Sequence, residues 1–137
     1  MNAWRLKCGF FLWILIGFSA AGCAAFVAGG VAVGVGVGAA EYIQGELKQA
    51  YAASMEKTWE ACLAAAQNMK MTVVEKSIDN TDKNRMIKGQ TQDGKDFQMA
   101  LEALGPDVTQ VSVRIGIFGD EEYSQKIHRA IAQNLKK

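Results

Sequence analysis

Histidine, proline and cysteine are scarce in this chain, which has one, one and three of them among 137 residues. A zinc site normally takes three or four Cys, His or carboxylate ligands, and nothing pairs with His128 at ligand spacing. Cys8 and Cys23 lie near the start of the chain, so Cys62 has no partner for an internal disulfide. We therefore expect no metal site and no disulfide framework, with His128 at the flank of an apolar helix face and Cys62 as a buried thiol.

Charge is also limited, with 15 Lys and Arg against 14 Asp and Glu. A net charge of +1 leaves no basic patch of the kind that binds nucleic acid, so we expect no nucleic-acid partner. No charged residue lies between Lys7 and Glu41. This gap is too long for a secretion signal alone, and it divides the chain into an apolar N-terminal region and a mixed C-terminal domain.

The N-terminal region begins with the features of a cleaved secretion signal. Arg5 and Lys7 form a basic start, and an apolar run follows at residues 9–18. The next five residues, Ser-Ala-Ala-Gly-Cys at 19–23, resemble a bacterial lipobox, although Ala20 stands where such motifs usually have Leu. Residues 1–22 are then a lipoprotein signal peptide that is cut after Gly22, and Cys23 is the site of lipidation. The alternative is an uncleaved membrane anchor in which Cys23 is only a small apolar residue.

Residues 23–40 form a glycine-rich apolar segment with three possible structures. Gly30, Gly34 and Gly38 recur at every fourth position, so on a helix they make a smooth stripe against which another membrane helix packs. Valine alternates with alanine or glycine in the same segment, which fits a flexible tether or an extended strand equally well.

Residues 41–137 are expected to form one α+β domain, which is long enough to bury its own core. Ser54 is a helix cap, and an apolar stripe with helical spacing follows it, ending at Met69. Asp120 caps a second helix that carries its own apolar stripe, including Ile127 and Ile131. The segment 42–51 shows no clear period and is either a short edge strand or the lead-in to the first helix.

Four strands are predicted between the two helices. They cover residues 71–77, residues 85–92, a stretch around Phe97 to Glu102, and a stretch that ends at Ile117. In the last strand Val111, Val113, Ile115 and Ile117 alternate with polar residues, which is typical of an antiparallel sheet covered on one side. Asp93-Gly94 and Gly105-Pro106-Asp107 supply turns. The predicted fold is a four-stranded antiparallel meander with two helices on one face, in the order helix, four strands, helix.

The sequence contains no recognisable catalytic, metal-binding or cofactor-binding motif. Asp79, Asp82 and Asn84 are oxygen-bearing residues that suggest calcium, but an EF-hand loop needs Gly where Asn84 stands and Glu where Gln90 stands. The glycines at 34, 36 and 38 are not followed by the Lys-Ser/Thr of a phosphate-binding loop. No serine lies in a Gly-x-Ser-x-Gly motif. We therefore expect a protein that is not an enzyme and that needs no cofactor.

Several of these stretches together resemble a domain-of-unknown-function family of short Gram-negative bacterial lipoproteins. They are the lipobox, the glycine-rich segment, Gly45-Glu46-Leu47, the helix with Trp59 and Ala61, and the run from Gly116 to Asp120 followed by Ser124 and Ile127. The resemblance implies a cell-envelope lipoprotein held in the membrane by its acyl group, and it implies no activity. Ala24 is not the aspartate that usually retains such proteins in the inner membrane, so the outer membrane, facing the periplasm, is favoured.

Two functional hypotheses follow. In the first, the protein is a non-catalytic envelope lipoprotein whose domain binds an envelope protein or polymer through the polar face of its sheet. That face is predicted to carry Lys88, Gln98, Glu102, Gln110, Ser112 and Arg114. In the second, the protein is an integral membrane structural component with an uncleaved N-terminal helix, and its glycine stripe packs helices together.

Overall fold

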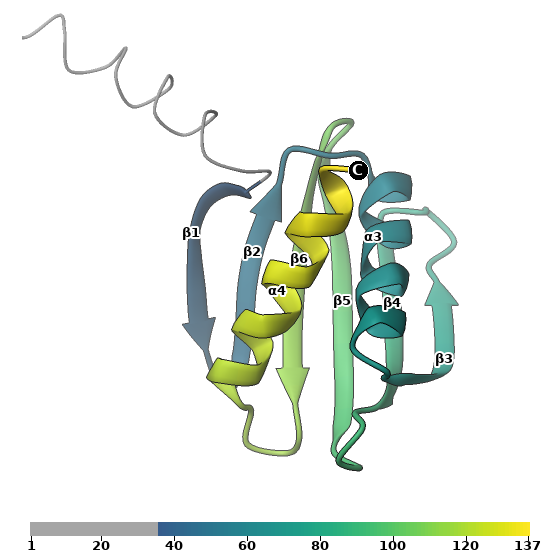
Figure 1. Ribbon diagram of the computed structural model, residues 1–137. Coiled ribbons are helices and arrows are strands. Elements are labelled where there is room, and N and C mark those ends of the chain that lie inside the picture. Colours follow the sequence, from purple (N-terminus) through teal and green to yellow (C-terminus); the bar gives the residue numbers. More distant parts are fainter. Residues whose placement is uncertain (1–35) are drawn as a thin grey trace, which may run out of the picture. The chain divides into compact units, whose positions relative to one another are not determined.

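Six strands and two helices make up residues 36–137, the part of the chain that the computed structural model describes. Their bounds are β1 (Gly36–Ile43), β2 (Glu46–Tyr51), α3 (Met55–Asn68), β3 (Thr72–Ile78), β4 (Asn84–Gln90), β5 (Asp96–Gly105), β6 (Val108–Ile115) and α4 (Glu121–Leu135). The strands form one antiparallel sheet in the order β1-β2-β6-β5-β4-β3. Both helices lie on the same face of this sheet, α4 over β2 and β6 and α3 over β5 and β4 (Figure 1). In this described part of the chain, no helix lies over the other face.

The prediction of an α+β fold with two helices on one face of an antiparallel sheet is confirmed, but the number of strands is wrong. The segment 42–51, left open between a strand and a helix lead-in, contributes to a hairpin of β1 and β2, and β2 pairs with β6. Gln44 and Gly45 both have positive φ, as a tight two-residue hairpin turn requires. The chain therefore runs strand, strand, helix, four strands, helix. The remaining four strands form the expected meander.

The start of β1 differs from the expected domain boundary. Residues 36–40, assigned above to the apolar segment, are extended and belong to this strand. Gly38 therefore lies in a strand and not on a packing helix. Gly30 and Gly34 lie outside the described residues, as do the predicted signal peptide and Cys23.

The predicted helix caps are confirmed in the structure. The Ser54 side chain accepts a hydrogen bond from the Lys57 backbone N–H at 3.5 Å, and the Asp120 side chain accepts one from the Tyr123 N–H at 3.0 Å. That hydrogen bond is the main reason why the pKa of Asp120 lies below its ordinary value. Each cap satisfies a backbone donor that the first turn of a helix leaves free.

The core lies between the sheet and the helices. Every second residue of β5 and β6 points into it, and the inward residues of these two strands are Phe97, Met99, Leu101, Thr109, Val111, Val113 and Ile115. α3 buries adjacent pairs of residues that recur about once per helical turn, and α4 buries Ile127 and Ile131. Burial of about 25 cal/mol per Å² of apolar surface makes this layer the main source of stability.

Arg85 is a buried cation that the periodicity of the sequence did not reveal. It points from β4 toward α3, where its guanidinium lies 5.4 Å from the centre of the Trp59 ring. It also forms ion pairs of 2.8 Å with Glu56 and 2.9 Å with Asp82. These contacts hold the start of α3 against the sheet, and the hydrogen bond to Asp82 is the largest influence raising the pKa of Arg85.

Ile117 does not lie in the last strand, as its alternation with Ile115 predicted. β6 ends at Ile115, and Gly116 with φ of 68° turns the chain away from the sheet. A local period of two cannot show where a strand stops, because the next apolar residue keeps the same pattern in a loop.

Neither helix in residues 36–137 has the length and apolar character needed to cross a membrane.

Candidate functional site

The face of the sheet opposite the two helices, called the open face below, is built from the alternate residues of the six paired strands. Cross-strand register places Glu46, Arg114, Gln98, Lys88 and Glu75 side by side, in a row that runs from β2 to β3. The next row contains Lys48, Ser112, Ala100, Met86 and Ser77. Neighbouring strands lie about 4.8 Å apart, so each row is a line of closely spaced side chains.

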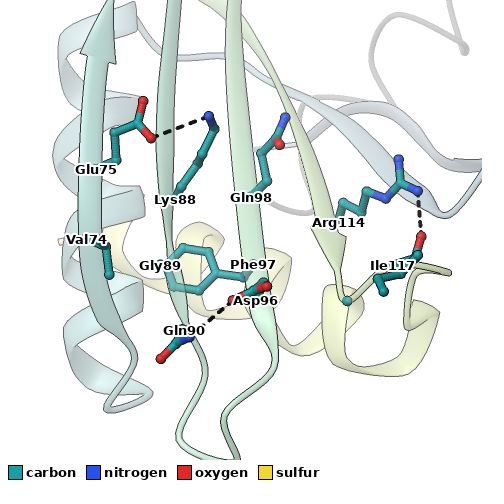
Figure 2. A pocket seen from close by; sticks show the side chains of 11 residues that line it. Val74, Glu75, Lys88, Gly89, Gln90, Asp96, Phe97, Gln98, Arg114 and Ile117 are labelled. Atoms are coloured by element: carbon teal, nitrogen blue, oxygen red, sulfur yellow. Dashed lines mark hydrogen bonds and ion pairs between the residues drawn. The ribbon is translucent and has the colours of Figure 1, made fainter.

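Two shallow hollows lie on the open face. The first has a volume of about 480 Å³, and Figure 2 shows the side chains around it: Val74 and Glu75 from β3, Lys88 and Gln90 from β4, Asp96, Phe97 and Gln98 from β5, Arg114 from β6, and Ile117. The Gln90 amide donates a hydrogen bond of 3.3 Å to the Asp96 carboxylate. The second, of about 450 Å³, is lined by residues of the next row, including Met86, Ala100 and Ser112. Both hollows are lined by polar and apolar side chains together, with more apolar than polar surface.

Large apolar side chains are exposed at the first hollow and in the loop that borders it. Phe118 is 91% exposed and Ile117 is 80% exposed, both in the loop between β6 and α4. Val74 on β3, which also lines the first hollow, is 74% exposed. Exposed apolar residues of this size are informative when they gather beside a hollow, because such sites often mark interaction surfaces.

The loop that carries Ile117 and Phe118 is held in place by two contacts. The Arg114 guanidinium donates a hydrogen bond of 2.6 Å to the Ile117 carbonyl. Gly119 lies directly against the backbone of Gly45 in the β1–β2 turn, where a Cβ on Gly119 would collide with the Gly45 carbonyl oxygen. A Cβ on Gly45 would in turn lie 2.7 Å from the Phe118 carbonyl oxygen. The exposed loop is therefore braced from both sides.

His128 is buried, with 3% of its surface exposed, and does not lie at the helix flank as expected. Its Nε2 lies 2.9 Å from the Leu47 carbonyl oxygen, and its Nδ1 lies 2.7 Å from the Tyr51 hydroxyl. A carbonyl can only accept, so Nε2 carries the proton and Nδ1 accepts from Tyr51. Burial is the main cause that lowers the pKa of His128 and raises that of Tyr51. Both ring nitrogens are used to join α4 to β2.

The remaining candidate groups have structural roles. Cys62 is fully buried in α3, as predicted, and burial raises the pKa of its thiol. The Asp79 carboxylate accepts hydrogen bonds from the backbone and hydroxyl of Thr81 and from the Asn84 amide. These bonds, led by that from the Thr81 backbone, lower the pKa of Asp79 and close the β3–β4 turn. Within residues 36–137, no three His, Cys, Asp or Glu side chains are grouped so that they could bind a metal ion.

Comparison with known proteins adds a family assignment to this geometry. A family model described as "Protein of unknown function (DUF3568)" matches residues 6–134, which is nearly the whole chain. The chain belongs to the DUF3568 family. No curated protein matches the chain. In this DUF3568 protein, two of the stretches on which the sequence resemblance rests meet in space, since Gly45 of the first contacts Phe118 and Gly119 of the second.

Most of the predicted surface residues of the DUF3568 domain lie on the open face. Lys88, Gln98 and Arg114 line the first hollow, and Glu102 and Ser112 line the second. Gln110 lies beside Glu102 in the register of β5 and β6. Sequence reasoning missed the contribution of β3, because a bulge between Val73 and Glu75 breaks its alternation and leaves Val74 on the rim of the first hollow.

Proposed function

We propose that this protein is a non-catalytic lipoprotein of the cell envelope whose α+β domain binds an envelope protein or polymer through its open face. One observation carries the proposal: both helices cover the same side of the sheet, and the other side has two hollows beside braced, exposed apolar side chains. An antiparallel sheet is stable with one solvated face, so fold stability alone does not require apolar side chains there. A binding surface accounts for these exposed apolar side chains.

The proposed attachment to the membrane rests on the N-terminal sequence. Arg5, Lys7 and the apolar run at 9–18 lead to the small residues before Cys23, with cleavage after Gly22 and acylation of the cysteine. Twelve residues, 24–35, then separate Cys23 from the start of β1. A chain of that length reaches at most about 40 Å, so the domain would stay close to the membrane surface. The resemblance of the sequence favours the periplasmic side of the outer membrane.

The structural roles of the reactive side chains support the proposal that the protein is non-catalytic. The sole histidine is buried and both its ring nitrogens are hydrogen-bonded. The Cys62 thiol is buried, and burial raises its pKa, which disfavours the reactive thiolate. The carboxylates of Asp79 and Asp120 close a turn and cap a helix.

Attachment is tested by the intact mass of the protein extracted from membranes beside that of a Cys23→Ser variant. We expect the wild-type chain to begin at Cys23 with added acyl mass and the variant to carry none. A wild-type chain that keeps Met1 and carries no lipid would contradict the proposal and favour the uncleaved membrane anchor.

Use of the open face is tested by placing a photo-crosslinking amino acid in the full-length protein in intact envelopes. Ser112 lies half-buried on the open face, and Gln133 is exposed on α4 as a matched control. We expect a discrete adduct from position 112 and none from position 133. Equal adducts from both positions, or none from 112, would count against a binding role for the open face.

A further inference from the structure

The charges along the central row of the open face have a definite order. Reading from β2 to β3, the row is Glu46, Arg114, Gln98, Lys88, Glu75. The two cations therefore flank a neutral amide at the centre, and the two acids lie at the ends. Because strands are spaced at about 4.8 Å, an anionic group above Gln98 lies within reach of both cations.

The central cations are only partly neutralised by their acidic neighbours. Lys88 Nζ lies 3.4 Å from a Glu75 carboxylate oxygen, and both side chains are about half exposed, so this pair is weak. Arg114 forms no ion pair within residues 36–137, although Glu46 is its register partner. It donates instead to the Ile117 carbonyl. A guanidinium has five N–H donors in all, so several remain for a ligand.

Apolar side chains border this row of donors. Val74 and Ile117 both line the first hollow, on the β3 and β6 sides of the row (Figure 2). The hollow is shallow and lies on the surface of the sheet, whereas sites for small molecules usually enclose most of the ligand. A shallow hollow of this kind suits a partner polypeptide that lies across the strands.

We propose that the first hollow binds a partner polypeptide through an isolated carboxylate side chain. The carboxylate lies over Gln98, between Arg114 and Lys88, and its apolar neighbours in the peptide contact Val74 and Ile117. The acids Glu46 and Glu75 at the ends of the row repel a uniformly anionic polymer or an anionic lipid surface, so the charge pattern selects one carboxylate between apolar residues. This inference rests on the proposed binding role of the open face and adds the chemistry of the partner.

The test uses the full-length protein in neutral detergent and a defined probe. The probe is a pool of acetylated, amidated pentapeptides with one central glutamate flanked by Val, Ile, Leu or Phe. A twin pool has glutamine at the centre, and free N-acetylglutamate serves as a small carboxylate. Binding is followed by NMR shifts of the backbone amides and of the Arg and Gln side chains.

We expect the glutamate pool to shift the signals of Lys88, Gln98 and Arg114 and to bind more tightly than either of the other probes. Arg114→Gln and Lys88→Gln should each weaken binding by about tenfold or more, since each removes a charge-assisted hydrogen bond. Arg129→Gln, on exposed α4, is the matched control and should leave binding unchanged. Lys88 donates its hydrogen bond to Glu75, whereas Arg114 donates to the Ile117 carbonyl in the loop. Lys88→Gln therefore still tests the proposal if Arg114→Gln disturbs that loop.

Equal binding of the glutamine pool, equal loss in the Arg129 variant, or no binding of the glutamate pool would overturn the inference. N-acetylglutamate binding as tightly as the pool would also overturn it in favour of a small carboxylate ligand. If the peptides fail while crosslinking from Ser112 succeeds, the open face still binds a partner and only the acidic chemistry is wrong. If both fail, the proposed function fails with it.

Discussion

At the scale of single residues, His128 shows how a polar side chain becomes part of the core. The imidazole is tolerated there because the Leu47 carbonyl and the Tyr51 hydroxyl satisfy both of its nitrogens. These partners lie 81 and 77 residues away in the sequence. The position of His128 next to Ile127 suggested a flank residue, and only the packing of α4 on β2 brings it inside.

The burial of His128 makes stability depend on pH. Burial lowers its pKa below the ordinary value of 6.5, so the unfolded chain takes up a proton before the folded one as pH falls. We expect the free energy of unfolding to be fully present above about pH 7 and to fall as the pH drops below about 6.5. Urea unfolding across this range measures the effect.

His128→Gln is the control for this pH profile, since glutamine can still donate to the Leu47 carbonyl but does not titrate. Asp79 and Asp120 have lowered pKa values and so titrate well below this range. The variant should be less stable but should show a flatter profile between about pH 7 and about pH 5.5. The same slope in both proteins would assign the effect to another group.

At the scale of elements, the β1–β2 turn and the β6–α4 loop support each other through contact of their backbones. Gly119→Ala adds a methyl group that meets the Gly45 backbone, in a residue whose φ is 84°. We expect it to reduce the free energy of unfolding by about 2–4 kcal/mol, as the sum of backbone strain and overpacking. Denaturant unfolding gives the value.

Gly116→Ala is a matched control in the same loop. Gly116 also has a positive φ, of 68°, but a Cβ there meets nothing within 4 Å. Its cost should therefore be strain alone, about 1 kcal/mol. Equal costs for the two variants would mean that the Gly45–Gly119 contact does not contribute to stability.

The exposed side chains of the same loop should be dispensable for folding. Phe118→Ala removes a side chain that is 91% exposed, so we expect stability to change by less than about 0.5 kcal/mol. Phe97→Ala removes a ring from the core and should cost about 3–5 kcal/mol. A large loss of stability in the Phe118 variant, measured by thermal or denaturant unfolding, would mean that Phe118 has a structural role and would weaken its assignment to a binding surface.

At the scale of the whole molecule, β1 completes the sheet, and its side chains at residues 39–43 lie outside the buried core. Among residues 39–137, whose burial the structure describes, the buried apolar side chains begin at Leu47 in β2, while those of residues 39–43 in β1 are exposed. β1 instead pairs with the backbone of β2 at both of its ends, with an irregularity between Val37 and Glu41, and leads into the turn that contacts Gly119. Its contribution is to satisfy the N–H and C=O groups at the edge of the sheet.

Comparison of two soluble fragments tests this role of β1. A fragment of residues 36–137 should unfold in a single cooperative transition. A fragment of residues 46–137 should keep the core but lose several degrees in Tm, and it should self-associate through the exposed edge of β2. Calorimetry and sedimentation give both readouts. If the fragment of residues 46–137 is monomeric and has the same Tm as the longer fragment, this role of β1 is contradicted.

The sequence by itself determined the parts of this protein that depend on neighbours along the chain. Ser54 and Asp120 identify the helix starts because a cap bonds to a backbone N–H three residues away. The faces of α3, β5 and β6 follow from spacings of three to four and of two residues, which are properties of a single element. The same local patterns placed Lys88, Gln98 and Arg114 on a polar face.

Only the tertiary structure decided which of these elements meet. It pairs β2 with β6 across the whole meander, buries His128 under α4, places Gly45 against Gly119 and gathers Val74 and Ile117 around one hollow. These contacts join residues far apart in the sequence, and their free energy comes from close packing and from satisfying buried polar groups. Local periodicity carries no information on either, because both depend on which distant element lies opposite.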